Sequence, residues 1–160
     1  MTIRVRPARA VEVPAVRDIV HAAYEPYRRR LAVAPAPLLA DDEAIISAMA
    51  CMVAIDGDRG DAIVGVLVMW PHPDHLLVEN VAVHPVQQGR GIGALLLAYA
   101  EREAVALGLP SVRLYTNELM TENLAWYPSR GYSETGRRQD GPYRRVRFEK
   151  LLASPIERPL

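Results

Sequence analysis

The sequence predicts an α/β or α+β fold in which helices cover both faces of a mixed sheet. Two observations predict it: apolar runs of strand length alternate with helical patterns along the chain, and no repeat or linker interrupts them. At 160 residues the chain has the usual size of one domain. We therefore expect a single domain over residues 1–160.

The first fifty residues predict a strand followed by two helices. Alternating apolar and polar residues from Ile3 to Arg6 are typical of a short strand. An apolar helical pattern begins at Val13, and Pro26 is expected to end that helix because proline disfavours helical geometry in the residue before it. After an irregular connection, an aspartate at position 41 or 42 can cap a short helix that extends to Met49.

The rest of the chain predicts six strands and two helices. Two apolar runs are joined by the turn residues Asp56 to Asp61, which is typical of a hairpin. A long helix ends at Gly108 and Pro110, in the order expected at a helix C-terminus. The expected strands are Cys51 to Ile55, Ala62 to Trp70, Leu76 to Val83, Ser111 to Thr116 and two after Gly131, and the second helix is Thr121 to Ser129.

The composition points to no polyanionic partner. Apolar residues make up 50% and charged residues 24% of the chain, and 19 Lys and Arg balance 19 Asp and Glu. Because the chain has no large field of one sign, we expect neither disorder nor nucleic-acid binding. No apolar run approaches the ~18 residues of a membrane span, and the N-terminus lacks the apolar core of a signal peptide. We therefore expect no membrane partner.

The single cysteine, Cys51, excludes an intrachain disulfide and a cysteine-rich metal site. We expect it to pack at the start of a strand, and a chain without disulfides fits a reducing compartment. The prediction is a cytoplasmic protein. Three histidines, His72, His75 and His84, lack the spacing of metal ligands, so no metal is expected.

The most informative run joins a buried strand to a helix through a turn with three glycines, Gln88-Gly89-Arg90-Gly91-Ile92-Gly93-Ala94. Glycines let backbone N–H groups approach a ligand closely, and a helix N-terminus adds about half a positive charge. Both features favour phosphate. The turn therefore predicts a cofactor that carries a pyrophosphate.

Other interpretations of this turn fit less well. A P-loop needs a lysine and a hydroxyl residue, and residues 93–95 supply neither. The spacing Gly89-x-Gly91-x-x-Ala94 formally satisfies the dinucleotide fingerprint, but a helical region and a hairpin precede it and too little chain follows for a doubly wound sheet. In a plain tight turn, three closely spaced glycines would cost conformational entropy without any return.

Two motifs resemble the GNAT superfamily of N-acyltransferases. Val81-Ala82-Val83-His84-Pro85 and the glycine turn after it are similar to that family's fourth strand and its Gln/Arg-x-x-Gly-x-Gly/Ala pyrophosphate loop. The run from Asn123 to Tyr132 resembles its later helix, in which a tyrosine precedes a Gly-Phe/Tyr pair. The predicted order of elements is also the family's. The resemblance implies a mixed, mostly antiparallel central sheet flanked by helices.

The resemblance further implies acetyl-CoA, or a close acyl-CoA relative, as cosubstrate and no metal. Backbone groups of Val81 and Val83 would bind pantetheine, and the glycine turn would bind the pyrophosphate. Many members place an asparagine seven residues before the tyrosine, where this chain has Met120, and we assign that role to Asn123. The residues implied to contact the cofactor are Val81, Ala82, Val83, Gln88, Gly89, Arg90, Gly91, Ile92, Gly93, Ala94, Asn123 and Tyr127.

Two residues are candidate catalytic groups. The resemblance implies that Tyr127 approaches the CoA sulfur. The pKa of a phenol is ~10 and that of a thiol is ~8.5, so the phenol would donate a hydrogen bond to the departing thiolate rather than transfer its proton. Otherwise Tyr127 is a core tyrosine. Glu79 and Asn80 interrupt an apolar strand, on opposite faces. Glu79 can accept a proton from an ammonium substrate, or pair with an arginine and serve only the fold.

The acceptor is expected to contact Tyr24, Tyr27, Glu79 and Asn80. Both tyrosines come before Arg28 to Arg30 in the chain. The resemblance places this region where the family's substrate-facing helices meet. These arginines can bind a carboxylate or form a solvated helix end.

The sequence as a whole therefore predicts an N-acetyltransferase that transfers an acetyl group from acetyl-CoA to a primary amine of a small molecule or peptide, by direct attack in a ternary complex. A non-catalytic acyl-CoA-binding module is the alternative, and a nucleotide-dependent oxidoreductase is a third interpretation. The sequence leaves a homodimer open.

Overall fold

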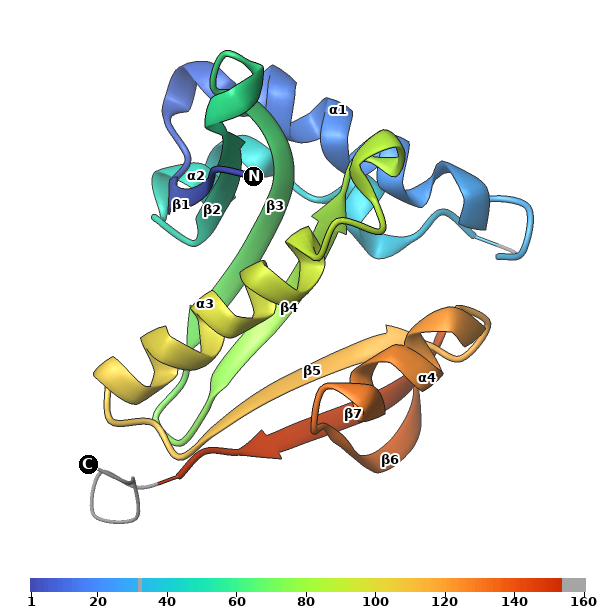
Figure 1. Ribbon diagram of the computed structural model, residues 1–160. Coiled ribbons are helices and arrows are strands. Elements are labelled where there is room, and N and C mark those ends of the chain that lie inside the picture. Colours follow the sequence, from blue (N-terminus) through green and yellow to red (C-terminus); the bar gives the residue numbers. More distant parts are fainter. Residues whose placement is uncertain (32, 154–160) are drawn as a thin grey trace. The chain divides into compact units, whose positions relative to one another are not determined.

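A computed structural model describes residues 1–31 and 33–153 of the chain. Strands and helices alternate along it in the order expected from the sequence (Figure 1). Within the described residues, the strands are β1 (Ile3–Pro7), β2 (Cys51–Asp56), β3 (Ala62–Pro71), β4 (Leu76–Val83), β5 (Ser111–Asn117), β6 (Ser133–Asp140) and β7 (Tyr143–Leu151). The α-helices are α1 (Val13–Tyr24), α2 (Asp42–Ser47), α3 (Ile92–Ala106) and α4 (Thr121–Ser129).

The strands form one mixed sheet in the order β1-β2-β3-β4-β5-β7-β6. The pair β4/β5 is parallel, and the pairs β1/β2, β2/β3, β5/β7 and β6/β7 are antiparallel. A parallel pair needs a crossover connection, and α3 supplies it between β4 and β5. The predicted mixed, mostly antiparallel sheet with flanking helices is therefore confirmed.

The chain divides into two compact units. Of the described residues, the first contains 1–31, 33–69 and 80–99, and the second contains 70–79 and 100–153. Strands β3 and β4 and helix α3 each contribute residues to both units. The expectation of a single domain over residues 1–160 stays a prediction.

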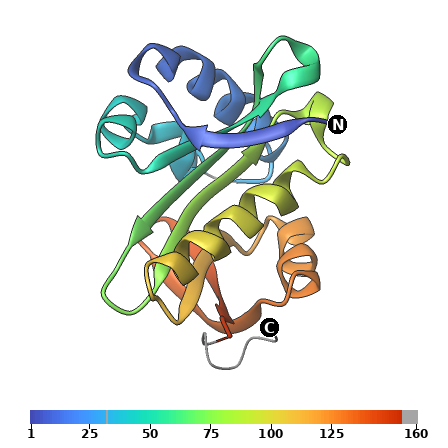
Figure 2. The same ribbon diagram turned by 60° about the vertical axis from the view of Figure 1, so that its left-hand side comes forward.

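In the first unit, the start of α3 packs against one face of the β2/β3 pair. Ala54 lies opposite Gly65 in the register, and a Cβ atom added to Gly65 would come within 3.0 Å of Leu96 and 3.2 Å of Ile92. Gly65 therefore lets the helix approach the strand closely. Figure 2 shows this unit with β1 running beside β2.

The opposite face of β2 meets α2 and the segment before α1. Cys51 and Met52 are neighbours in the strand, so their side chains point to opposite faces of the sheet. Cys51 is 2% exposed. Burial, together with the nearby carboxylates of Asp42 and Glu12, raises the pKa of the Cys51 thiol to about 12. A thiol with such a pKa stays protonated at neutral pH, so Cys51 packs at the start of a strand as expected. In this unit the sheet is covered on both faces.

The end of α2 differs from the prediction. Asp41 caps the helix as expected, because its side chain accepts a hydrogen bond from the Ala44 N–H at 3.0 Å. The helix ends at Ser47 rather than at Met49, and Met49 has a φ of 60°. Its N–H donates to the Ile46 carbonyl at 3.0 Å, which closes the last turn. A left-handed Met49 was not predictable from a residue type that rarely adopts that conformation.

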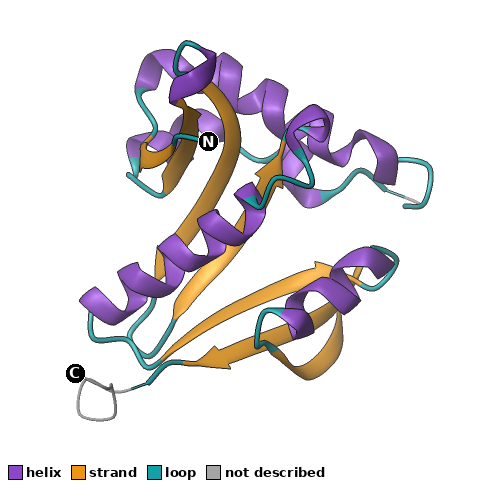
Figure 3. Ribbon diagram, viewed as in Figure 1, coloured by secondary structure: helices purple, strands orange, loops and turns teal. Residues whose placement is uncertain are grey.

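In the second unit, β5 lies between β4 and β7, and α4 contacts the outer strand β6 (Figure 3). The core beside α4 is aromatic. The Tyr127 ring centre lies 5.7 Å from that of Phe148 and 6.0 Å from that of Tyr132. Gly131, with a φ of 92°, turns the chain from α4 toward β6. The predicted range of α4 is therefore confirmed, and Tyr127 is fixed in it by ring packing.

Candidate active site

The glycine turn lies in the first unit between β4 and α3. Gly89 and Gly91 have φ angles of 82° and 80°, a conformation that residues with a side chain rarely adopt. Both glycines are exposed, and nothing lies within 4 Å of the positions where their Cβ atoms would be. The first unit thus presents open backbone at the N-terminus of a 15-residue helix, which suits an anion such as a pyrophosphate.

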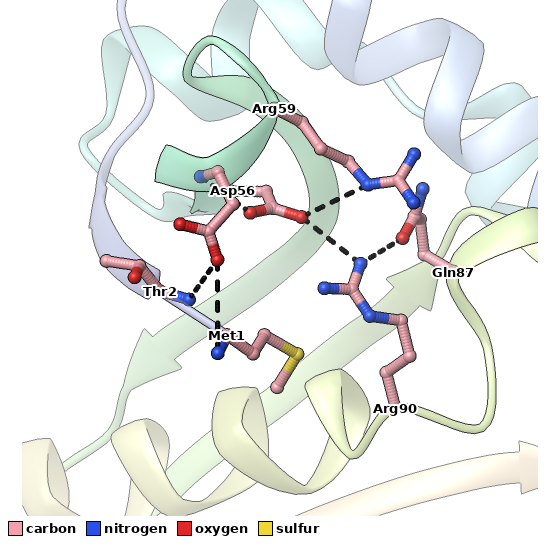
Figure 4. A network of polar contacts seen from close by, with 7 residues as sticks. Met1, Thr2, Asp56, Arg59, Gln87 and Arg90 are labelled. Carbon is pink, nitrogen blue, oxygen red and sulfur yellow. Dashed lines mark hydrogen bonds and ion pairs between the residues drawn. The ribbon is translucent and has the colours of Figure 1, made fainter.

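The polar side chains of the turn point back into the protein. Gln88 Nε2 donates to the Val83 carbonyl at 3.2 Å, at the end of β4. The Arg90 guanidinium donates to Asp56 Oδ2 at 3.1 Å and also to Gln87 Oε1 (Figure 4). Both side chains therefore have partners within the protein.

The remaining predicted cofactor residues of the first unit lie on β4 and in the first turn of α3. Ala82 is 2% exposed and Ile92 is 1% exposed, and Ile92 packs at Gly65. These two can offer backbone groups only. The half-buried members of the set are Val81, Val83, Gly93 and Ala94.

Asp56 is a residue of this region that the sequence did not single out. Its side chain is fully buried at the end of β2. Oδ1 accepts from the Asp58 N–H at 3.0 Å, and Oδ2 lies 3.5 Å from Arg59 and 3.1 Å from Arg90. The only signal in the sequence was a carboxylate directly after five apolar residues, which equally well starts a turn.

Glu79 and Asn80 lie on opposite faces of β4, as alternation predicted. Burial alternates along the strand, so that Asn80 is 7% exposed and Glu79 is half-buried. Tyr24 Oη donates to Asn80 Oδ1 at 2.8 Å. The structure therefore brings two of the predicted acceptor residues, Tyr24 and Asn80, into direct contact within the first unit.

The second predicted tyrosine, Tyr27, follows α1 in a short 3₁₀ turn. Its ring centre lies 6.3 Å from that of Tyr24, and the Arg30 guanidinium lies 5.2 Å from the Tyr27 ring centre. Arg28 pairs with Glu25 at 3.3 Å in an exposed contact. These local partners favour the solvated helix end for Arg28 and Arg30.

Glu79 belongs to the second unit, where Trp70 binds it. Trp70 Nε1 donates to Glu79 Oε2 at 2.7 Å. Within residues 1–31 and 33–153, no arginine forms an ion pair with Glu79, so the arginine partner considered from the sequence is not found there. A neutral N–H donor orients the carboxylate without cancelling its charge.

Tyr115 of β5 lies within electrostatic reach of this carboxylate in the second unit. Burial raises the pKa of Tyr115, and the negative charge of Glu79 adds to that rise. The Arg145 guanidinium lies 4.3 Å from the Tyr115 ring centre and 3.5 Å from Asp140. Trp70, Tyr115 and Arg145 were not predicted as site residues, because they come from three different strands.

The tyrosine half of the predicted site also lies in the second unit. Tyr127 is 7% exposed, and its ring lies 5.1 Å from Trp126. Asn123 Nδ2 donates to Thr116 Oγ1 at 3.1 Å, which ties α4 to β5. Met120, at the position where the family has an asparagine, is 6% exposed and precedes α4. Asn123 thus has an internal partner, and its assignment to the pantetheine arm stays a prediction.

Comparison with known families identifies the family of this chain. A family model described as the acetyltransferase (GNAT) family matches residues 14–132. The chain belongs to this GNAT family. It is therefore an acetyl-CoA-dependent N-acetyltransferase. The matched range includes the glycine turn from Gln88 to Ala94.

Solved structures share the GNAT fold over almost the whole chain. The PaiA N-acetyltransferase of Thermoplasma acidophilum, solved with coenzyme A, is 14% identical over 95% of this chain and 100% of its own, with a TM-score of 0.80. The ribosomal-protein-S18-alanine N-acetyltransferase of Escherichia coli is 16% identical over 96% of this chain and 97% of its own, with a TM-score of 0.72. At such identities the likeness shows the fold alone. No curated protein matches the chain significantly.

Two further properties concern the described part of this GNAT chain. None of its helices has the length and apolar character needed to cross a bilayer. Among the same residues, no group of three or more His, Cys, Asp and Glu side chains is arranged to hold a metal ion. The expectations of a cytoplasmic location, of no metal and of an open oligomeric state stay predictions.

Proposed function

We propose that this GNAT enzyme transfers the acetyl group of acetyl-CoA to a primary amine of a small molecule or peptide, by direct attack in a ternary complex. The observation that carries the proposal is the exposed backbone at Gly89 and Gly91, in a chain that matches the family model. In the reaction a C–N bond forms and the C–S bond of the thioester breaks. The amine loses a proton and the thiolate leaves.

The cofactor side uses backbone groups. The N–H groups of the turn from Gln88 to Ala94 and the N-terminus of α3 hold the pyrophosphate, since its charge is stabilised by aligned peptide dipoles. Backbone groups of Val81 and Val83 hold the pantetheine arm. Such positioning accounts for much of the rate, because the thioester is already an activated acyl group.

Glu79 accepts the proton that the attacking amine loses, directly or through water. An ammonium group is not a nucleophile, so a carboxylate near it has a direct effect on the rate. Trp70 supports this role because its N–H fixes one carboxylate oxygen at 2.7 Å and brings no opposing charge. Tyr24, Tyr27 and Asn80 of the first unit are the further residues proposed to contact the acceptor.

Tyr127 donates a hydrogen bond to the departing thiolate. A full proton transfer from a phenol to a thiolate would be uphill by roughly 2 kcal/mol, given their ordinary pKa values. A hydrogen bond that strengthens as charge develops on sulfur avoids this cost. The ring packing around Tyr127 supports a fixed position for its hydroxyl.

A non-catalytic acyl-CoA-binding module is the second candidate, and thiol release separates the two. The purified protein is incubated with acetyl-CoA and a panel of amines, amino acids, polyamines and peptide N-termini, and free thiol is measured. We expect at least one amine to raise thiol release well above the rate of hydrolysis. Binding of acetyl-CoA without amine-dependent release across the panel would favour the module.

A further inference from the structure

A polar network of the first unit lies beside the glycine turn, and the proposed reaction does not use its side chains. It consists of Asp56, Asp58, Arg59, Gln87 and Arg90 (Figure 4). We call these residues the Asp56 network. It joins the end of β2 and the β2/β3 hairpin to the residues on both sides of Gly89.

Asp56 is the most deeply buried member of the network. Its carboxylate is fully buried, whereas the Arg90 side chain is 29% exposed. Arg59 lies 3.5 Å from Asp56 Oδ2 and Arg90 lies 3.1 Å from it, so Arg90 makes the shorter of the two ion pairs. Releasing Arg90 to a ligand would leave the buried carboxylate with the longer ion pair alone, and its charge would be compensated less well.

Arg90 makes two contacts from one guanidinium nitrogen. Nη1 donates to Asp56 Oδ2 at 3.1 Å and to Gln87 Oε1. Gln87 is 7% exposed and ends the 3₁₀ turn before Gly89, while Arg90 follows Gly89. The Arg90 guanidinium therefore links the residue after Gly89 to Gln87 before it, and holds both at Asp56.

We propose that Arg90 is a positioning residue: its side chain, held by Asp56 and Gln87, fixes the glycine turn so that the backbone N–H groups converge on the pyrophosphate, and it does not bind the phosphates itself. This inference rests on the proposed function and assigns the side chain differently from a direct phosphate contact. Gly89 and Gly91 are flexible by nature, so a turn without this link would lose more conformational entropy on binding.

Calorimetric titration of coenzyme A tests the assignment with three variants, Arg90→Ala, Asp56→Asn and the double variant. If Arg90 positions the turn, each single change raises the Kd by roughly tenfold. The Kd of the double variant is then no higher than the higher of the two single-variant values, because all three variants lose the same contact between Arg90 and Asp56. If Arg90 binds phosphate directly, Asp56→Asn would free it and leave the Kd unchanged or lower, which would overturn the proposal.

Salt dependence supplies a second readout that does not require Asp56→Asn to fold. A guanidinium that contacts phosphate contributes an attraction that salt screens, so its removal would flatten the dependence of Kd on ionic strength. We expect Arg90→Ala to keep the wild-type dependence while its Kd is raised. A flattened dependence, or a lower melting temperature with an unchanged Kd, would contradict a positioning role.

The matched control is Arg4→Ala. Arg4 of β1 pairs with Asp61, in the turn of the same hairpin, at 3.3 Å, and both side chains are more than half exposed. The Arg4→Ala change removes an arginine ion pair of the hairpin without altering the glycine turn. The Kd for coenzyme A is expected to stay at the wild-type value. Wild-type protein that binds no coenzyme A would refute the proposed function, whereas binding that ignores Arg90 and Asp56 would refute only this inference.

Discussion

Trp70 and Glu79 lie nine positions apart in the chain and meet across the β3/β4 turn, where the indole N–H donates to the carboxylate at 2.7 Å. Both residues are half-buried. A charged group accepts a strong hydrogen bond in such surroundings, and the bond holds Glu79 in one orientation. The relationship gives the proposed proton acceptor a defined place in the second unit.

Glu79→Gln tests that role. The amide keeps the size of the side chain and can still accept from Trp70, so we expect the melting temperature and the affinity for acetyl-CoA to stay near wild type. The value of kcat/KM at neutral pH should fall well over tenfold and recover in part at high pH, as the free amine becomes abundant. Steady-state rates across pH measure both effects.

The control for this change is Glu134→Gln, which alters an exposed carboxylate on β6 that pairs with Arg137 at 2.6 Å. It should leave the rate profile intact. A Glu79→Gln enzyme that is fully active across the pH range would return Glu79 to a structural role and leave solvent as the proton acceptor.

Gly91→Ala should weaken acetyl-CoA binding by more than it destabilises the fold. The added Cβ meets nothing within 4 Å in the protein, so it reaches only the space where the pyrophosphate is proposed to bind. Its φ of 80° also makes any side chain strained. Gly108→Ala is the matched control, with a φ of 73° and equally open surroundings at the end of α3.

Thermal melting should show a similar loss of stability for the two glycine variants, and calorimetry should show weakened binding only for Gly91→Ala. Equal affinities in the two folded variants would mean that the turn is structural.

Tyr127→Phe should lower kcat by roughly 10- to 1000-fold with a smaller change in the KM for acetyl-CoA, because the lost hydrogen bond forms chiefly as the thiolate departs. Tyr132→Phe is the control. Tyr132 is also buried and its ring packs against Tyr127, but its hydroxyl donates to Glu101 at 3.4 Å, so the change to Phe keeps the ring and removes only that hydrogen bond. An unchanged kcat in Tyr127→Phe would assign that phenol to packing.

Acid should reveal the ion pair between Arg6 and Glu12. Two hydrogen bonds from the Arg6 guanidinium, at 2.7 and 2.8 Å, lower the pKa of Glu12 from 4.5 to about 2. A lowered pKa stabilises the fold above pH 4.5, and this contribution is lost as the pH falls toward 2. Glu12→Gln should therefore lower the free energy of unfolding at pH 7 and lose that difference near pH 2.

Urea unfolding of wild type and Glu12→Gln at several pH values measures this convergence. Glu25→Gln, which breaks an exposed pair with Arg28, should change the stability little at any pH. A gap between wild type and Glu12→Gln that stays constant in acid would show that the pair does not account for the stability.

Sequence patterns predicted most of the fold because they report local physics. Alternation placed Glu79 and Asn80 on opposite faces of β4, and the structure confirms this. Glycine spacing found the turn at Gly89 and Gly91, where the backbone does adopt left-handed geometry. Such features depend on residues close together in the chain.

The partners of these residues were not predictable, because they depend on register between distant segments. Asp56 looked like the start of a hairpin turn, yet it binds Arg90, 34 positions later. Tyr24 meets Asn80 across 56 positions. Single residues of this kind carry no periodic signal, so only the folded chain shows that they are in contact.

Calorimetric titration of the wild-type protein with acetyl-CoA, NAD and ATP tests the central claim most directly. A turn that holds the pyrophosphate of an acyl-CoA predicts saturable binding of acetyl-CoA, tighter than that of either nucleotide, and a higher melting temperature in its presence. Tighter binding of NAD or ATP, with no measurable binding of acetyl-CoA, would contradict the account.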